Sequence, residues 1–382
     1  MKVAFNRPSI TDLEKKYVED SLFSKKICGD NKYTKLVEEK FLKLFNLRIM
    51  LITSCSHALD MTAILGDFKS GDEIIVPSYT FVSTVNCFVL RGAKPIFVEV
   101  DPKTMNIDPN KIEEKINKKT KAIYVVHYAG VACDMDKVME IAKKYNLKVI
   151  EDAAQAVGSY YKNKLLGTFG DYATHSFHET KNIVMGEGGS LIVKNDKEFE
   201  LAEMIREKGT NRKQFFKGFV DKYSWQVPGS SFLPSDILAA ILYGQLERFE
   251  EIQEKRLKIW NNYNKVLEKY EKKGLLNRPF IPDYATNNAH LYYMILPSEE
   301  IRDLFIKFMK KSDIETPFHY VPLHLSKMGV KLGYKKGDLP ITEEYASRLV
   351  RLPLYADMSD EDMEYVNSKL IEFFERELNN EI

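Results

Sequence analysis

Cysteine is scarce in this chain of 382 residues, and its four cysteines form no binding pattern. They are widely spaced, with no CxxC pair, at Cys28, Cys55, Cys87 and Cys133. This spacing argues against a disulfide framework or a cysteine-based zinc site, and it is typical of free thiols in a reducing compartment.

Long apolar runs are also missing. No segment approaches the roughly 18 apolar residues of a membrane span. The charged stretch 12–20 follows the first residues closely, so the apolar core of a signal peptide is absent. We therefore expect a cytoplasmic protein without a membrane partner. A net charge of +1 gives no overall basicity that would favour a nucleic-acid partner.

Two common ligand motifs are absent as well. No HExxH motif or paired His/Cys spacing accompanies the histidines, so we predict no catalytic metal. No GxGxxG follows an apolar run, which disfavours a dinucleotide site. The histidines that could suggest a metal are His127, His178, His319 and His324.

The first two thirds of the chain alternate short apolar runs with amphipathic stretches. Helical spacing marks residues 12–23, 33–45, 58–68, 82–90 and 135–145, and apolar runs lie at 49–53, 73–77, 96–100, 122–126, 149–150, 172–177 and 190–193. Near-continuous apolar strands between helices predict an α/β fold with a mostly parallel sheet covered on both faces.

The pattern changes after about residue 235. Asp236–Tyr270 has the charged, periodic character of one long helix, and a strand at 291–295 and a terminal helix at 360–378 follow. We expect a large domain at 1–245 and a smaller α+β domain at 246–382.

One lysine and one aspartate occupy positions that suggest cofactor chemistry. Lys181 lies between the apolar run 172–177 and the glycine-rich stretch 186–190, and Asp152 lies two residues after the apolar run 149–150. A lysine that forms a Schiff base and an acid that pairs with a pyridinium nitrogen are what pyridoxal phosphate (PLP) requires. The alternatives are a solvated surface lysine and an aspartate that caps a helix.

Other residues could complete such a site. The junction 53–58 offers backbone N–H groups and the Ser56 hydroxyl to a phosphate. Ser176 could add a further phosphate contact, and Gln155 could reach the ring oxygen of the cofactor. Phe81 could stack on the ring, although a lone aromatic residue is more often part of a core.

The chain resembles the DegT/StrS family of PLP-dependent sugar aminotransferases over essentially its whole length. Within that family it is most similar to dTDP-4-amino-4,6-dideoxygalactose transaminases. The resemblance is carried by the segments Pro77–Thr84, Val126–Cys133, Ser176–Asn182, Arg206–Arg212, Asp221–Trp225 and Phe318–His324.

The resemblance implies PLP fold type I, like aspartate aminotransferase, with a seven-stranded sheet in the large domain, and a homodimer with shared active sites. It assigns Lys181 to the covalent bond with PLP, Asp152 to the ring nitrogen and Gln155 to the ring oxygen. It places Phe81 over the ring. The residues that it implies at the phosphate are Cys55, Ser56 and Ser176 from the same chain.

The resemblance also implies contacts from the segment 206–225 to the partner subunit's pocket. Many family members have a G-x-N-x-R pattern whose asparagine reaches the partner's cofactor phosphate. Here Ser231 and Leu233 stand at the asparagine and arginine places, so Ser231 or Asn211 would replace that contact. The residues implied near the sugar nucleotide are Lys208, Arg212, Tyr223, His319, Tyr320 and His324.

The implied reaction takes an amino group from L-glutamate to dTDP-4-keto-6-deoxy-D-glucose, for enterobacterial common antigen or lipopolysaccharide O-antigen synthesis. Three alternatives remain open. The first is an aminotransferase for another sugar position or nucleotide sugar, and the second is a non-catalytic sensor with the same fold. The third, a related sugar dehydratase, is disfavoured because those relatives replace the lysine with histidine and this chain keeps Lys181.

Overall fold

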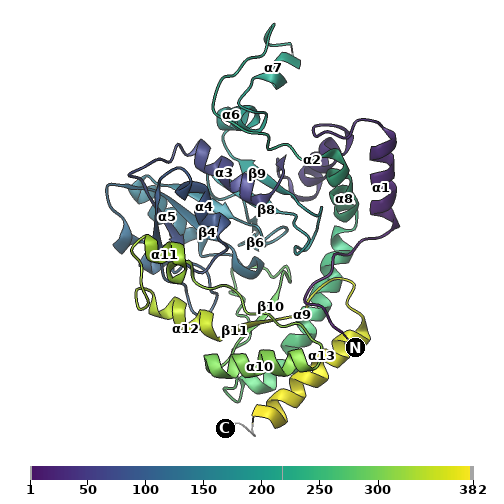
Figure 1. The fold of residues 1–382 in the computed structure, drawn as a ribbon, viewed down its shortest axis with the longest axis vertical. Helices are drawn as coiled ribbons and strands as arrows, with labels where there is room; N and C mark the ends of the chain where they lie inside the picture. The colour runs from purple at the N-terminus through teal and green to yellow at the C-terminus, as the bar shows by residue number, and fades with distance from the viewer. Residues whose placement is uncertain (1, 217, 379–382) are drawn as a thin grey trace.

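The computed structural model describes residues 2–216 and 218–378. A sheet-containing part forms the upper half of the molecule, and a second part built around three helices lies below it (Figure 1). No helix in these residues combines the length and the apolar character needed to cross a membrane.

The upper part is built on a seven-stranded sheet in the order β1-β9-β8-β5-β4-β2-β3. β9 is antiparallel to both of its neighbours and the other strand pairs are parallel, which confirms the expected mostly parallel α/β sheet. The strands are β1 (Met50–Ile52), β2 (Glu73–Pro77), β3 (Lys94–Val98), β4 (Thr120–Val126), β5 (Lys148–Asp152), β8 (Tyr172–Ser176) and β9 (Gly189–Val193).

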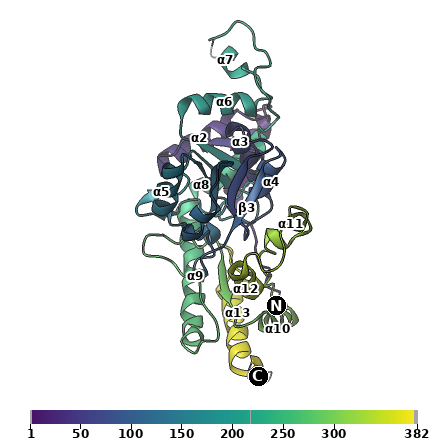
Figure 2. The ribbon, with the colours of Figure 1, turned by 90° about the vertical axis from the view of Figure 1, so that its left-hand side faces the viewer.

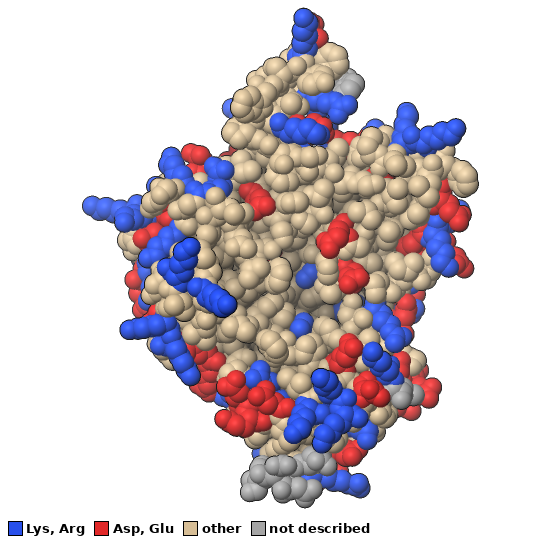
Figure 3. Space-filling view, viewed as in Figure 1, with Lys and Arg blue, Asp and Glu red and all other residues tan. Residues whose placement is uncertain are grey.

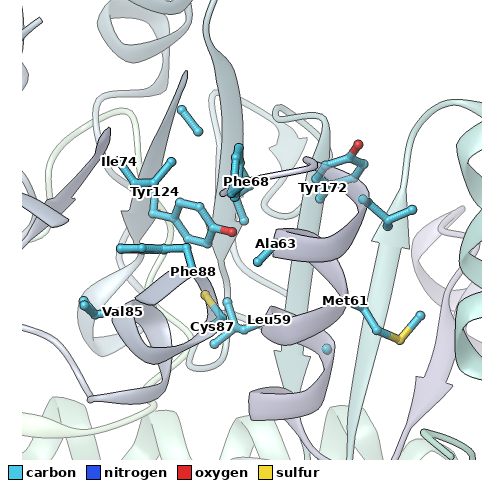
Figure 4. Packing of buried hydrophobic residues seen from close by; sticks show 14 of the residues in the cluster. Leu59, Met61, Ala63, Phe68, Ile74, Val85, Cys87, Phe88, Tyr124 and Tyr172 are labelled. Carbon is cyan, nitrogen blue, oxygen red and sulfur yellow. The ribbon is translucent and has the colours of Figure 1, made fainter. Parts of the chain in front are cut away.

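Helices cover both faces of this sheet. Successive residues of a strand point to opposite faces, so neighbouring residues of one strand pack against different helices. Ile74 and Val76 pack with α3 (Cys55–Leu65), α4 (Ser83–Val89) and α6 (Asp196–Arg206), as Figure 4 shows in part. Ile75, between them, packs with α5 (Met135–Tyr145). α2 (Lys32–Phe45) and α8 (Asp236–Glu247) cover another part of that second face, and α1 (Asp12–Phe23) packs on α8.

The second part has its own core. α9 (Phe249–Glu271), α10 (Glu299–Lys311) and α13 (Asp360–Glu372) pack around the antiparallel pair β10 (Tyr292–Ile295) and β11 (Leu349–Leu352). Val3, near the start of the chain, is buried in the same core and pairs with Ile314. The proposed domain division at 245/246 stays a prediction.

The remaining elements are short. They are α7 (Arg212–Phe216), α11 (Lys327–Lys331), α12 (Pro340–Arg348), β6 (Tyr160–Tyr161), β7 (Lys164–Leu165), 3-10 turns at Pro109–Lys111, Glu113–Lys115, Tyr128–Gly130 and Leu323–Leu325, and a π-helix at Phe373–Glu377.

The long helix predicted over Asp236–Tyr270 is in fact two helices. α8 ends at Glu247 and α9 begins at Phe249. Arg248 between them has non-helical backbone angles, and its side chain bonds Glu14 at 3.0 Å and Glu251 at 3.2 Å. The two helices therefore pack in different cores. The apolar face of α8 packs on the sheet part, and that of α9 packs in the second part.

The segment 207–231 projects from the sheet part. It carries α7 at the end of the molecule far from the C-terminus in both ribbon views (Figures 1 and 2). Its exposed aromatic residues are Phe215, Phe219, Tyr223 and Trp225.

Candidate active site

A cavity of about 510 Å³ lies where the carboxyl ends of β4, β5 and β8 meet the second part of the molecule. Asp152 ends β5 and Ser176 ends β8, and both line this cavity. Ligands of α/β sheets bind at this edge because the loops and helix N-termini that follow the strands converge there. Lys181 and Arg351 are the basic side chains of the described lining, and blue surface is visible in the hollow near the centre of the face in Figure 3.

Asp152 is buried and held by two hydrogen bonds. The Thr84 hydroxyl donates to Oδ2 at 2.7 Å, and the Ala154 N–H donates to Oδ1 at 3.1 Å. Burial raises the pKa of Asp152, and these two bonds oppose the rise because they favour the carboxylate. No helix starts directly after Asp152 in the described structure, so the helix-cap alternative does not apply.

Lys181 lies in the loop between β8 and β9 and lines the same cavity. Its backbone N–H donates to the His178 carbonyl at 2.9 Å. Burial lowers the pKa of Lys181 and the charge of Arg351 adds to the effect, whereas Cys55 and Asp152 oppose it. A lowered pKa increases the fraction of neutral amine, which is the form that attacks a carbonyl carbon.

The N-terminus of α3 provides an anion-binding end of the cavity. Ser54 caps this helix by accepting from the His57 N–H, and the N–H groups of Cys55 and Ser56 make no hydrogen bond in the described part of the chain. The hydroxyls of Ser56 and Ser83 lie 2.7 Å apart beside them. Free N–H groups at a helix N-terminus bind phosphate oxygens.

Gln155 has a fixed side-chain orientation. Its Oε1 accepts from the Ala129 N–H at 2.7 Å, so its Nε2 is the donor, and this atom donates to the Tyr320 hydroxyl at 3.3 Å. Tyr320 belongs to an aromatic group with Phe81, whose ring centroid is 6.3 Å away. Phe81 is exposed, at 56%.

His319 lies beside this aromatic group. Its Nδ1 is 3.0 Å from the Tyr128 hydroxyl, and its carbonyl accepts from the Tyr79 hydroxyl. Burial lowers the pKa of His319 well below its ordinary value, so its ring is neutral at physiological pH.

The cavity thus brings together nine of the residues predicted to contact the cofactor or the substrate. They are Cys55, Ser56, Phe81, Asp152, Gln155, Ser176, Lys181, His319 and Tyr320.

His324 lies outside the cavity lining. It is fully buried, its Nδ1 bonds Ser78 at 2.7 Å and its Nε2 bonds Glu343 at 3.0 Å. Both ring nitrogens are therefore used within the protein, and the expected approach to the sugar nucleotide is replaced by a contact that joins β2 to the second part.

Five predicted residues lie in the projecting segment instead. Lys208 and Arg212 bond Glu207, at 2.9 and 3.3 Å, and Asn211 accepts from the Ser224 N–H at 2.8 Å. Ser231 pairs with Glu207 through the backbone, and Tyr223 is exposed. Their predicted roles need a second subunit and stay predictions.

The structure adds residues that the sequence did not point to. Thr84 supports Asp152 directly, and its position at the end of the segment 77–84 was the available signal. His290, Arg351 and Phe5 also line the cavity, but they are far from Lys181 along the chain and carry no local motif. Among the described residues, no three His, Cys, Asp or Glu side chains are grouped to hold a metal ion.

Comparison with known proteins agrees with this geometry. The DegT/DnrJ/EryC1/StrS aminotransferase family matches residues 8–371. GDP-perosamine synthase of Escherichia coli O157:H7 is 33% identical over 379 residues, covering 96% of this chain and 97% of that protein.

Solved structures are similar over the full length. Helicobacter pylori PseC, an aminotransferase of pseudoaminic acid biosynthesis, has a TM-score of 0.90 at 25% identity, covering 98% of this chain and 100% of that one. The Spr1654 protein of Streptococcus pneumoniae in its pyridoxamine phosphate (PMP) form has a TM-score of 0.91 at 25% identity and covers 100% of both chains. The chain therefore belongs to the DegT/DnrJ/EryC1/StrS family and is a PLP-dependent sugar aminotransferase of fold type I.

Proposed function

We propose that this enzyme transfers the amino group of L-glutamate to carbon 4 of dTDP-4-keto-6-deoxy-D-glucose, giving dTDP-4-amino-4,6-dideoxy-D-galactose and 2-oxoglutarate. The observation that supports the aminotransferase chemistry is that buried Asp152, the amine of Lys181 and the free N-terminus of α3 share one cavity. The choice of this sugar rests on the similarity to dTDP-4-amino-4,6-dideoxygalactose transaminases over the segments named above.

The residues present fit PLP. We assign Lys181 to the covalent bond with the cofactor, Asp152 to its ring nitrogen and Gln155 to its ring oxygen. The α3 N-terminus at Cys55 and Ser56 would hold its phosphate together with Ser176, and Phe81 would cover its ring. When bound, PLP supplies an aldehyde that captures an amine and a ring that draws electrons from the adjacent carbon.

The protein moves the protons. The Nζ of Lys181 would take the α-proton of glutamate in the first half of the cycle, and it would handle the proton at carbon 4 of the sugar in the second half. Positioned proton transfer of this kind contributes about 10²–10⁴-fold in rate. The Asp152 carboxylate, held by Thr84 and Ala154, would keep the ring nitrogen protonated throughout.

We also propose that two chains share their active sites. Asn211 and Ser231 would approach the partner subunit's cofactor phosphate, and Lys208, Arg212 and Tyr223 its sugar nucleotide. His319 and Tyr320 would contact the sugar from the same chain. We propose His324 as a residue that positions the cavity wall, since its ring bonds Ser78 and Glu343.

The test is incubation with L-glutamate and dTDP-4-keto-6-deoxy-D-glucose, followed by NMR of the sugar product and assay of 2-oxoglutarate. The proposal expects an axial amine at carbon 4. An equatorial amine, or an amine at carbon 3, would replace it with another sugar aminotransferase specificity.

GDP-linked and UDP-linked 4-keto sugars are the comparison substrates, because one relative is named for a GDP-linked product. Efficient turnover of one of these, without turnover of the dTDP sugar, would contradict the choice of nucleotide. A colourless protein that binds the dTDP sugar and releases no 2-oxoglutarate would favour the non-catalytic sensor. A dTDP-linked product would suit synthesis of enterobacterial common antigen or O-antigen.

A further inference from the structure

Asn182 follows Lys181 directly, and its buried side chain makes three hydrogen bonds to the second part of the molecule. Nδ2 donates to the Asn288 carbonyl at 2.7 Å and to Gln253 Oε1 at 2.9 Å. Oδ1 lies 2.8 Å from Nδ1 of His290. The loop that carries the lysine is therefore tied to residues far from it along the chain.

The orientation of the Asn182 amide is fixed by its partners. A backbone carbonyl only accepts, so Nδ2 faces Asn288. Gln253 donates its own Nε2 to the same carbonyl at 3.1 Å, which leaves its Oε1 as the acceptor for Asn182. Oδ1 of Asn182 consequently accepts from Nδ1 of His290. Burial lowers the pKa of His290 well below its ordinary value, in agreement with a neutral ring that is protonated on Nδ1.

The segment 287–290, which receives these bonds, is itself held firmly. Arg256 of α9 donates to the carbonyls of Ala289 and His290, and the Ala289 side chain lies in the core of the second part. Ala289 has a φ of +49°, and its N–H donates to Asn287 Oδ1 at 2.8 Å. A left-handed alanine is strained and persists only where its surroundings fix it. The segment is thus a rigid anchor.

The same segment holds the loop of Gln155. Nδ2 of Asn288 donates to the carbonyls of Gln155 at 2.8 Å and Val157 at 3.3 Å, and its Oδ1 accepts from the His290 N–H at 3.0 Å. A Cβ on Gly130 would lie 2.0 Å from that Oδ1, so glycine leaves the room that Asn288 occupies. One segment of the second part is therefore bonded to the loops of both Lys181 and Gln155.

Lys181 depends on such an anchor because its amine has none of its own. Within the described residues Nζ makes no hydrogen bond or ion pair, and the backbone N–H bonds the His178 carbonyl of the same loop at 2.9 Å. The place of the amine in the cavity is therefore set by where the backbone of the loop lies. Asn182 fixes that backbone one residue after the lysine.

We propose that Asn182 is a positioning residue for Lys181, because it holds the lysine loop on the segment 287–290 and so fixes the reacting amine relative to Gln155. This inference rests on the proposed function, which gives Lys181 the covalent bond with PLP and Gln155 the ring oxygen. In PLP the carbon that binds the lysine and the ring oxygen are attached to adjacent ring atoms. The two residues must therefore keep one spacing, and the segment 287–290 is bonded to both loops.

The alternative is that Asn182 only stabilises the contact between the two parts. Thr342 of α12, which leads directly into β11, offers a matched control for this. Its buried hydroxyl donates to Glu99 at 2.5 Å and accepts from the Val100 N–H at 3.2 Å, so it also joins strands of the sheet part to the rest of the molecule. It lies outside the cavity lining. Thr342→Val removes these two bonds at nearly constant volume.

The first test needs no turnover. In the PLP-loaded enzyme, Asn182→Ala should shift the midpoint of the pH titration of the visible absorbance by about half a pH unit or more, because this band reports the protonation of the bond between Lys181 and the cofactor. Hydrogen exchange of the peptide 178–185 should become about tenfold faster. Thr342→Val should change neither quantity. Equal changes in both variants, or no change in Asn182→Ala, would overturn the proposal.

The second test follows each half-reaction by absorbance in single-turnover mixing. Because Lys181 moves a proton in both halves, Asn182→Ala should slow both by about 10- to 100-fold at saturating substrate, while the half-saturating concentrations stay within about threefold. Thr342→Val should keep both rates. A loss confined to one half-reaction would assign Asn182 to contact with that substrate and overturn the positioning role.

Gln253 gives a sharper version of this test, because it lies on α9 outside the cavity lining and contacts Asn182. Gln253→Ala should slow both half-reactions by about two- to tenfold. The double variant should be no slower than Asn182→Ala alone, since the two residues act through one connection. Losses that multiply in the double variant would contradict the proposal.

Failure of the proposed function gives a different result. If Lys181→Ala keeps full activity, the lysine assignment falls and this inference falls with it. If Lys181→Ala is inactive while Asn182→Ala behaves as the unaltered enzyme in both tests, the function stands and the positioning role falls. The keto sugar that the unaltered enzyme accepts serves in the second test, whichever nucleotide it carries. Far-ultraviolet circular dichroism and the melting temperature of each variant check that it is folded.

Discussion

Lys181 and Asp152 have opposite tasks in the same cavity, and burial acts on both. Burial lowers the pKa of the lysine and raises that of the aspartate, so each is shifted toward its neutral form. The rise in the Asp152 pKa is opposed by hydrogen bonds from Thr84 and Ala154, which favour the carboxylate. The Lys181 amine, in contrast, makes no hydrogen bond or ion pair in the described structure. The lysine is therefore the group that is free to react.

Lys181→Ala should purify without covalently bound PLP and lose turnover by at least about 10²–10⁴-fold, since it removes both the covalent anchor and the proton carrier. Absorbance of the desalted protein and the rate of 2-oxoglutarate release measure the two effects. Lys194→Ala, at an exposed lysine just after β9, should behave as the unaltered enzyme. Full activity in Lys181→Ala would refute the assignment.

At the scale of elements, the phosphate end of the cavity depends on how closely β9 approaches α3. A Cβ on Gly189 would lie 2.5 Å from the Cys55 nitrogen and 2.7 Å from the His175 oxygen. Both contacts are with backbone atoms, so no side-chain rotation can relieve them. Glycine at this position lets the helix N-terminus sit against the strand that follows the Lys181 loop.

Gly189→Ala should displace the N-terminus of α3, weaken PLP binding by about tenfold or more and cost about 1–3 kcal/mol in the free energy of unfolding. Gly274→Ala is the control because its φ of +73° strains alanine while nothing lies within 4 Å of the new Cβ. It should lose stability and keep its PLP affinity. Equal PLP affinity in both variants would show that the α3–β9 contact does not shape the phosphate site.

At the scale of the whole molecule, the projecting segment 207–231 is difficult to explain in a single chain. Phe219 and Trp225 are each 76% exposed, and the segment reaches away from the sheet part (Figures 1 and 2). Exposed aromatic residues on a projection are typical of a surface that another protein covers. The proposed homodimer would bury them.

We expect the protein to be a dimer, and we expect the double variant Phe219→Ser, Trp225→Ser to shift it toward monomer at micromolar concentration, because those rings would lose their buried contacts. Light scattering coupled to size-exclusion chromatography measures the mass. Leu90→Ser, at another exposed apolar residue at the end of α4, is the control. A monomeric unaltered enzyme, or a double variant that stays fully dimeric, would contradict this interface.

The sequence by itself determined the mostly parallel sheet and the central pair of residues. Apolar runs such as 73–77 and 122–126 become buried strands because both of their faces are covered, and periodic segments such as 135–145 become helices. Asp152 ends one strand of the sheet and Lys181 follows the neighbouring strand, so their approach to one edge depends only on strand order and direction. Local patterns carry that information.

The tertiary structure alone decided which distant residues without a local motif join the cavity. Arg351 and His290 line the same cavity as Lys181 because the second core docks on the sheet, and His324 bonds Ser78 and Glu343 outside the cavity lining. The break at Arg248 likewise follows from α8 and α9 packing in different cores. These outcomes depend on contacts between residues far apart along the chain, which periodicity and spacing do not encode.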